Sequence, residues 1–140
     1  ELLNLIDADT EAFFTVLNAY RMPQSTKDQV SIRNKTIDKA MKQACNIPFR
    51  TLQCCYEIMN YAQKTAESGN PNSVTDAGVG AEMAHAAAQS AAMNIKINLN
   101  QIDDVKYTNK MYVQTDKLIK ETEEVLEIVR NIVLKKINSE

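Results

Sequence analysis

The stretch of residues 69–94, GNPNSVTDAGVGAEMAHAAAQSAAMN, contains the side chains of this sequence that are best suited to chemistry. The hydroxyls of Ser73 and Thr75 and the carboxylate of Asp76 stand where a helix is expected to begin. The first N–H groups of a helix have no partner within it, so these side chains lie beside free donors. The carboxylate is therefore a candidate for binding a ligand or moving a proton. Alternatively, Ser73 and Asp76 have capping-box spacing and only start the helix.

All three glycines of the chain, Gly69, Gly78 and Gly80, lie in the same stretch. A glycine within a helix costs about 1 kcal/mol relative to alanine, so Gly78 and Gly80 need a compensating gain. Either tight helix packing or the close approach of a ligand would supply it. The sequence leaves both explanations open.

Other polar side chains of this helix sort by their angle around its axis. At 100° per residue, Asp76, Asn94 and Asn98 fall near one side, and His85 falls nearly opposite Asp76. Asp76 and Asn94 are about 27 Å apart at a rise of ~1.5 Å per residue, so they cannot act on one reacting centre within a chain. Asn94 and Asn98 are expected to act across a dimer interface or to bond to neighbouring helices. His85 is expected to be an ordinary core or surface histidine.

Hydrophobic periodicity predicts about five helices and no strand. The expected ranges are 1–20, 26–46, 48–68, 73–99 and 103–138. Thr26 and Gln29 have capping-box spacing, Pro48 suits the first turn of a helix, and Gly69 suits the C′ position after one. No break separates these segments, so residues 1–140 are expected to form a single domain.

The expected helix 73–99 is rich in alanine, with steps of three and four residues that line one side: Ala77, Ala81, Ala84, Ala88 and Ala91. Small side chains let neighbouring backbones approach closely. The sequence therefore predicts an all-α, up-and-down helical bundle in which helix 73–99 is central and the last helix packs along it.

The composition argues against several classes of function. Sixteen basic and 18 acidic residues give a net charge of −2, which does not suit a nucleic-acid partner or a polybasic membrane surface. No apolar run approaches the ~20 residues that span a bilayer. The three cysteines show no metal-ligand spacing, so we expect free thiols, no metal site and a cytoplasmic protein. The first helix begins at Glu1 without a capping residue, which indicates either a frayed end or a chain that starts inside a longer protein.

Two segments, together with the order of helices between them, resemble one known family: LIDADTEAFFTVLNAYRMP and GNPNSVTDAGVGAEMAHAAAQSAAMNIKINL. The chain is similar to the cyclodeaminase/cyclohydrolase family, which includes formimidoyltransferase-cyclodeaminase and methenyltetrahydrofolate cyclohydrolase. Members carry a further N-terminal segment with a GGGSVAA-like motif, which these 140 residues lack. The chain thus resembles the C-terminal two-thirds of a member and is expected to be an N-terminally truncated fragment.

The resemblance implies an enzyme of folate one-carbon metabolism. A cyclodeaminase, an ammonia-lyase, closes 5-formimidoyltetrahydrofolate to 5,10-methenyltetrahydrofolate and releases ammonia. A cyclohydrolase instead adds water to the methenyl carbon. One carboxyl group can act as base and then as acid in either reaction. Asp76 matches the aspartate of the family motif, which makes it the candidate catalytic residue.

The implied substrate contacts are Ser73, Thr75, Gly78, Gly80, Asn94 and Asn98. Beyond a tetrahydrofolate derivative as substrate, no cofactor is required. The resemblance also implies a homodimer or higher homo-oligomer with an extensive helical interface. The alternative function is a non-catalytic helical module that only dimerises. The sequence does not distinguish ammonia from water chemistry.

Overall fold

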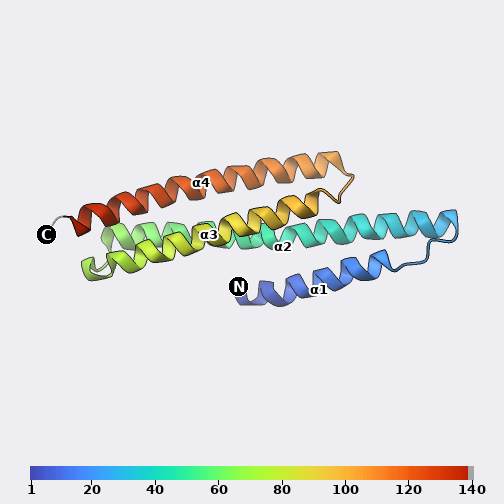
Figure 1. Ribbon diagram of the computed structural model, residues 1–140, viewed down its shortest axis with the longest axis horizontal. Helices are drawn as coiled ribbons and strands as arrows, with labels where there is room; N and C mark the ends of the chain where they lie inside the picture. Colours follow the sequence, from blue (N-terminus) through green and yellow to red (C-terminus); the bar gives the residue numbers. More distant parts are fainter. Residues whose placement is uncertain (139–140) are drawn as a thin grey trace.

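The computed structural model describes residues 1–138, and these are almost entirely helical (Figure 1). The elements are α1 (Leu2–Tyr20), α2 (Lys27–Ser68), the 3-10 turn η1 (Pro71–Ser73), α3 (Val74–Leu99) and α4 (Val105–Ile137). Successive helices run in opposite directions, so the all-α, up-and-down bundle is confirmed. None of the described helices is long and apolar enough to cross a membrane.

The residues described form four α-helices, whereas the sequence predicted about five. The expected helices 26–46 and 48–68 are one helix, because α2 continues through Pro48. Proline has no N–H to give to the carbonyl four residues earlier, which is that of Ala44. The side-chain amide of Asn98, on α3, donates a long 3.4 Å hydrogen bond to this carbonyl. A distant residue thus satisfies the group that proline leaves open.

Both ends of α2 lie at residues that the sequence marks as helix ends. Thr26 forms the predicted capping box, because its side chain accepts from the Gln29 N–H and the Gln29 side chain accepts from the Thr26 N–H. Gly69 follows the last residue of α2 directly, with φ −76° rather than a left-handed backbone. A side chain there would clash with the carbonyl oxygen of Thr65, which explains the glycine.

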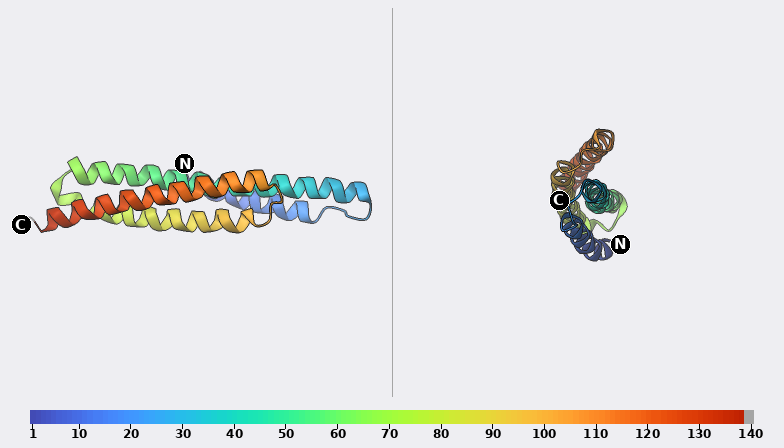
Figure 2. Two further views of the ribbon diagram at one scale, coloured as in Figure 1. Left: turned by 90° about the horizontal axis from the view of Figure 1, so that it is seen from above. Right: turned by 90° about the vertical axis from the view of Figure 1, so that its right-hand side faces the viewer.

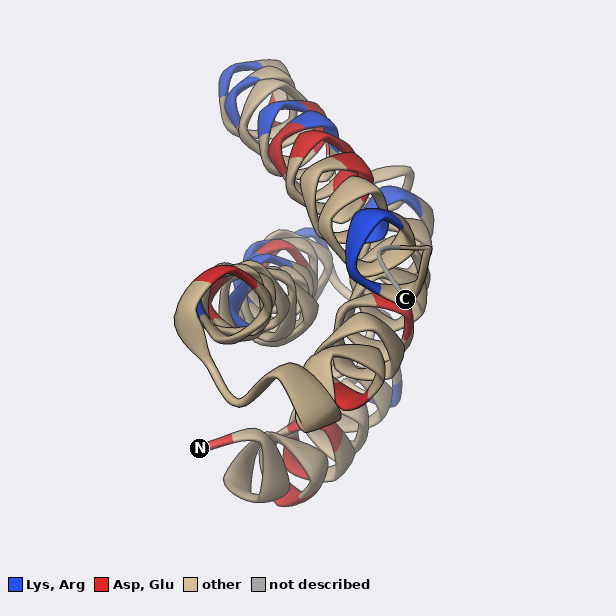
Figure 3. Ribbon diagram, turned by 90° about the vertical axis from the view of Figure 1, so that its left-hand side faces the viewer, with Lys and Arg blue, Asp and Glu red and all other residues tan. Residues whose placement is uncertain are grey.

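Three helices form a curved layer and the fourth lies inside the curve. Seen along the bundle, α4, α3 and α1 follow an arc with α3 in its middle, and α2 packs on the concave side (Figures 2 and 3). α1 is much shorter than α2 and accompanies only the N-terminal part of it (Figure 1). One side of α3 therefore has a neighbouring helix along only part of its length.

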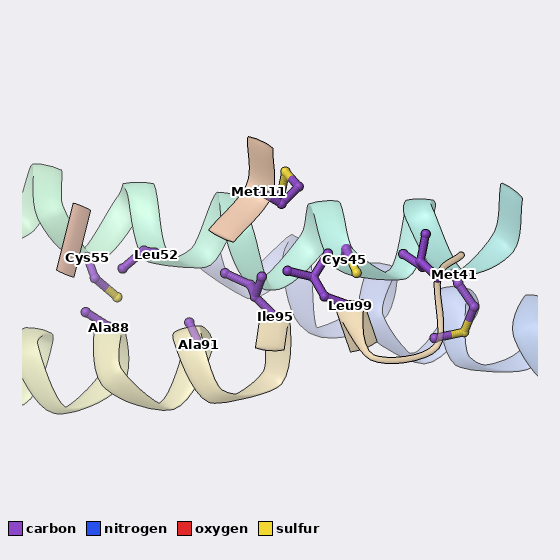
Figure 4. Close-up of a cluster of buried hydrophobic side chains, with 10 residues drawn as sticks. Met41, Cys45, Leu52, Cys55, Ala88, Ala91, Ile95, Leu99 and Met111 are labelled. Carbon is purple, nitrogen blue, oxygen red and sulfur yellow. The ribbon is translucent and has the colours of Figure 1, made fainter. Parts of the chain in front are cut away.

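Alanines of α3 form its contact with the rest of the bundle. Ala84 and Ala88 are 7% and 0% exposed, so the predicted burial of helix 73–99 and the packing of α4 along it are confirmed, although α2 is the helix that contacts all three others. One core cluster fills the end of the bundle near the α3–α4 connection (Figure 4), with members from α2, α3 and α4 such as Leu52, Ile95 and Met111. A second cluster around Met59 and Val129 fills the other end.

Candidate functional site

A groove runs between α1 and α3, with α2 as its floor. Two adjoining hollows of about 590 and 430 Å³ make up this α1–α3 groove, and Asp9 and Asn94 line both of them. Its walls are otherwise largely apolar. The lining comprises Leu2, Leu5, Ile6, Thr10, Phe13, Val16 and Tyr20 of α1; Met41, Ala44, Ile47, Pro48 and Thr51 of α2; Ala87, Ser90, Ala91 and Asn98 of α3; and Gln101 of the α3–α4 connection.

The polar groups of this groove come from opposite walls. Asp9 projects from α1 and Asn94 from α3, and neither side chain has a hydrogen-bond or ion-pair partner among the residues described. Asn98 lies one turn beyond Asn94, and its amide is engaged by the Ala44 carbonyl. An apolar cleft with a few unengaged polar groups on facing walls is the usual form of a small-molecule site.

α1 is an acidic helix, and its Asp9 supplies a carboxylate to the groove. Its charged residues are Asp7, Asp9 and Glu11, and it carries no lysine or arginine (Figure 3). Leu2, Leu5, Ile6, Phe13 and Val16 share one side of α1 with Asp9. A carboxylate within an apolar stripe is visible in the sequence, and this pattern is the signal that indicates Asp9.

The residues predicted at the start of α3 lie away from this groove. Asp76 is exposed in the first turn of α3 and has no hydrogen bond or ion pair among the described residues. Ser73 precedes α3, and its side chain makes no capping hydrogen bond, so the capping box considered for Ser73 and Asp76 is not formed. Whether Asp76 is catalytic stays a prediction.

Thr75 and Gly78 line a different hollow, of about 470 Å³, between α3 and α4. Glu82 and Arg130 border it as a bidentate ion pair, with N–O distances of 2.6 and 2.9 Å. The Arg130 guanidinium lowers the pKa of the Glu82 carboxyl by hydrogen bonding to it. This pair ties α3 to α4, and it leaves neither group free to move a proton.

The two glycines of α3 have different surroundings. A methyl group on Gly78 would lie 3.1 Å from Cγ2 of Val133, so this glycine permits the close approach of α4. A methyl group on Gly80 would meet nothing within 4 Å. Packing within the chain thus accounts for Gly78, and Gly80 borders open space.

The remaining candidates for chemistry are engaged or buried. His85 is half-buried on the side of α3 that faces α4, with its Nδ1 buried and without a hydrogen-bond partner. The cysteines are free, as predicted, and all three are buried. Burial raises the pKa of the Cys45 thiol to about 11, so it is not a nucleophile near neutral pH.

Comparison with known proteins shows the family to which this chain belongs. The family described as Formiminotransferase-cyclodeaminase matches residues 1–117. The chain belongs to this family. Methenyltetrahydrofolate cyclohydrolase of Methylorubrum extorquens is 32% identical over 137 residues, which are 98% of this chain and 66% of that protein. Formimidoyltransferase-cyclodeaminase of Gallus gallus is 28% identical over 89% of this chain.

A solved structure of the family has the same arrangement of helices. The crystal structure of formiminotetrahydrofolate cyclodeaminase from Thermotoga maritima superposes with a TM-score of 0.82 at 25% identity, over 96% of this chain and 63% of that one. The chain thus spans less than two thirds of these relatives, and only 23% of the Gallus gallus protein.

Proposed function

We propose that this chain acts in folate one-carbon metabolism, as a formimidoyltetrahydrofolate cyclodeaminase or as a methenyltetrahydrofolate cyclohydrolase. The observation that carries the proposal is the α1–α3 groove, in which the Asp9 carboxylate and the Asn94 carboxamide line opposite apolar walls. Family membership supports the same conclusion, because relatives bear both names.

The charge of the groove suits the reacting group. A formimidoyl group is an amidine and is protonated near neutral pH, and the methenyl group is a cationic amidinium within a ring. Asp9 would stabilise either cation by a charge-assisted interaction. The apolar walls would cover the pteridine ring, and Asn94 would bond to the donors and acceptors on its edge.

Either reaction needs a group that first accepts a proton and then donates one. In cyclodeamination N10 attacks the formimidoyl carbon and loses its proton, the C–N bond to the terminal nitrogen breaks, and that nitrogen leaves as ammonia after gaining a proton. In cyclohydrolysis water adds to the methenyl carbon and loses a proton; the bond from that carbon to N5 then breaks as N5 gains a proton and the new hydroxyl loses its own to become the formyl oxygen. A carboxylate can be base and then acid. We assign this role to Asp76 of a second copy of the chain in a homodimer, because Asp76 of the same chain lies about 27 Å from Asn94 at ~1.5 Å per residue.

The residues around Asp76 are assigned to binding the same substrate. Ser73, Thr75, Gly78 and Gly80 are assigned to the substrate together with Asp76, and no cofactor beyond the tetrahydrofolate derivative is required. Three free thiols support a cytoplasmic location.

Equilibrium binding of 5,10-methenyltetrahydrofolate to the 140-residue chain tests the groove. Asp9→Asn should weaken binding about 10- to 100-fold, as expected for the loss of one charge-assisted contact. Asp7→Asn is the matched control, because it removes a carboxylate from the same helix outside the groove lining. Equal affinity of the two variants would refute the role of the groove. Release of ammonia, or consumption of the methenyl compound, then identifies the reaction.

A further inference from the structure

The two hollows of the α1–α3 groove differ in the groups that they offer to a ligand. The first hollow, of about 590 Å³, lies beside residues 2–10 of α1, and the second hollow, of about 430 Å³, lies beside residues 9–20. Of the described residues, only Asp9 and Asn94 line both, so these two side chains mark the junction between the hollows. A ligand that fills the groove therefore meets three different surroundings along its length.

The first hollow offers hydrogen-bond acceptors. Three hydroxyls line it, and each donates its proton to the carbonyl four residues earlier in its own helix: Thr10 to Ile6 at 3.1 Å, Thr51 to Ile47 at 3.2 Å and Ser90 to Ala86 at 2.9 Å. A hydroxyl whose proton is engaged in this way still accepts hydrogen bonds through its lone pairs. Together with the Asp9 carboxylate, these hydroxyls present acceptors from three helices. The first hollow thus suits a group that is rich in N–H donors.

The second hollow offers aromatic and apolar surface. Its lining includes Phe13, Tyr20 and Met41, and none of the described residues that line it is a serine or a threonine. The Cζ atom of Arg33 lies 5.6 Å from the centre of the Tyr20 ring. The guanidinium donates to the Tyr20 carbonyl and forms no ion pair within residues 1–138. This end of the groove thus suits an aromatic ring that is followed by an anion.

A tetrahydrofolate carries groups of these kinds in the same order. Its pyrimidine ring has N–H donors on the 2-amino group and on N3. The bridge between N5 and N10 holds the reacting cation, and the aminobenzoyl ring follows with its anionic glutamate. In the reverse orientation, the N–H donors would face aromatic rings and lose their hydrogen bonds, and the glutamate would point to the acceptor-lined end beside Asp9.

We propose that the folate lies with its pyrimidine in the first hollow, its N5–N10 bridge between Asp9 and Asn94, and its aminobenzoyl ring in the second hollow. This orientation rests on the function proposed above. The O4 carbonyl is next to N5 and accepts from the Asn94 carboxamide at the junction, and the Arg33 guanidinium binds the glutamate. The three hydroxyls of the first hollow then recognise the 2-amino group and N3, which makes them determinants of specificity.

A photoreactive ligand tests the orientation. 5,10-Methenyltetrahydrofolate with an azide on its benzoyl ring should, on irradiation, label residues 13–20 of α1 or Met41, which border the second hollow. Cleavage after Glu11 separates residues 13–20 from the start of α1, and tandem mass spectrometry then locates the label. An excess of the unlabelled ligand should suppress it. Labels on residues 2–6 or 47–51 would show the reverse orientation and overturn the proposal.

Removal of the hydroxyls tests the first hollow. The loss of three acceptors should weaken equilibrium binding of 5,10-methenyltetrahydrofolate about 10- to 100-fold in the triple variant Thr10→Val, Thr51→Val, Ser90→Ala. The loss should be smaller for the analogue with hydrogen in place of the 2-amino group, which a general effect on folding would not produce. The matched control removes hydroxyls that make the same bond within a helix but lie outside the groove: Thr15→Val, Thr65→Val and Ser68→Ala. Equal losses in the two triple variants, or for the two ligands, would refute this role.

The other end of the ligand is tested at Arg33. Arg33→Gln should weaken binding of 5,10-methenyltetrahydrofolate about 3- to 10-fold and leave the methenyl derivative of tetrahydropteroate, which lacks the glutamate, unchanged. Lys35→Gln is the control, because it removes an exposed cation from α2 outside the groove lining. Equal losses for both ligands would refute the contact with the glutamate. A parent chain that binds no folate would refute the proposed function, whereas binding with the reverse labelling would refute the orientation alone.

Discussion

The two ends of α3 present the same side of one helix in two different settings. At the C-terminal end, Asn94 and Asn98 lie opposite α1, and the space between the helices forms a groove. At the N-terminal end, Asp76 and Gly80 occupy the same side, but α1 does not extend that far (Figure 1). A polar residue on a helix thus gains a binding site only where a second wall encloses it.

The largest effect of a substitution is expected at the N-terminal end of α3, which has no α1 opposite it. Asp76→Asn should lower the turnover of the folate substrate about 10²- to 10⁴-fold, as expected for the loss of an acid–base group. Folding should survive, because Asp76 is exposed and has no bonded partner among the described residues. Single-turnover rates and thermal unfolding of parent and variant would separate the two effects. Turnover at the parental rate would reduce Asp76 to an acidic residue in the first turn of α3.

A smaller effect should distinguish the inner face of α3 from its outer face. Ala88 is fully buried, so Ala88→Leu should overpack the contact with α2 and lower the free energy of unfolding by about 1–3 kcal/mol. Ala86→Leu, on the exposed side, should change it by less than about 0.5 kcal/mol. Urea titrations of the two variants measure the difference. Equal losses would contradict the packing described here.

The glycines at the N-terminal end should respond unequally to alanine. Gly80→Ala should raise the free energy of unfolding by up to about 1 kcal/mol, because alanine favours the helix and the added methyl group meets no atom within 4 Å. Gly78→Ala should gain less or lose stability, because its methyl group would press on Val133. The same denaturation experiment decides the order. A larger gain at Gly78 than at Gly80 would be inconsistent with these contacts.

The smallest effect on stability is expected at the C-terminal end of α3, where the side chain of Asn98 bonds to α2 beside its proline. Asn98→Ala should lower the free energy of unfolding by about 0.5–1 kcal/mol, because the Ala44 carbonyl loses its donor. In a Pro48→Ala background the new N–H can serve that carbonyl, so the same substitution should cost less. A double-mutant cycle measures this coupling. Purely additive effects would show that the hydrogen bond from Asn98 does not support the helix at Pro48.

Local signals predicted much of this fold. The capping box at Thr26, the helix ends near Tyr20 and Leu99, and the buried alanines of α3 all follow from spacing along the chain. The continuity of α2 could not be predicted in this way. It depends on an amide 54 residues away from the carbonyl that it serves.

The candidate site was harder to predict than the fold. Asn94 and Asn98 were selected on the polarity of α3, and the structure places both in the groove. Asp9 was overlooked, although it interrupts an apolar stripe. Tertiary packing determines which helix lies opposite another across a groove. The sequence alone therefore does not indicate that α1 forms one wall of the site.

The attachment of α1 has a consequence for how the groove opens and closes. α1 packs mainly on α2, and polar contacts hold both its ends: Arg50 bonds to Glu1 at 2.8 Å, and Arg33 bonds to the Tyr20 carbonyl at 3.1 Å. A helix held along one side is a natural unit of local unfolding, so its amides should exchange with deuterium before those of α3. A ligand that spans Asp9 and Asn94 binds only while α1 is docked. By linkage, such a ligand slows amide exchange throughout α1, and the occupancy of the groove becomes measurable at the first helix of the chain.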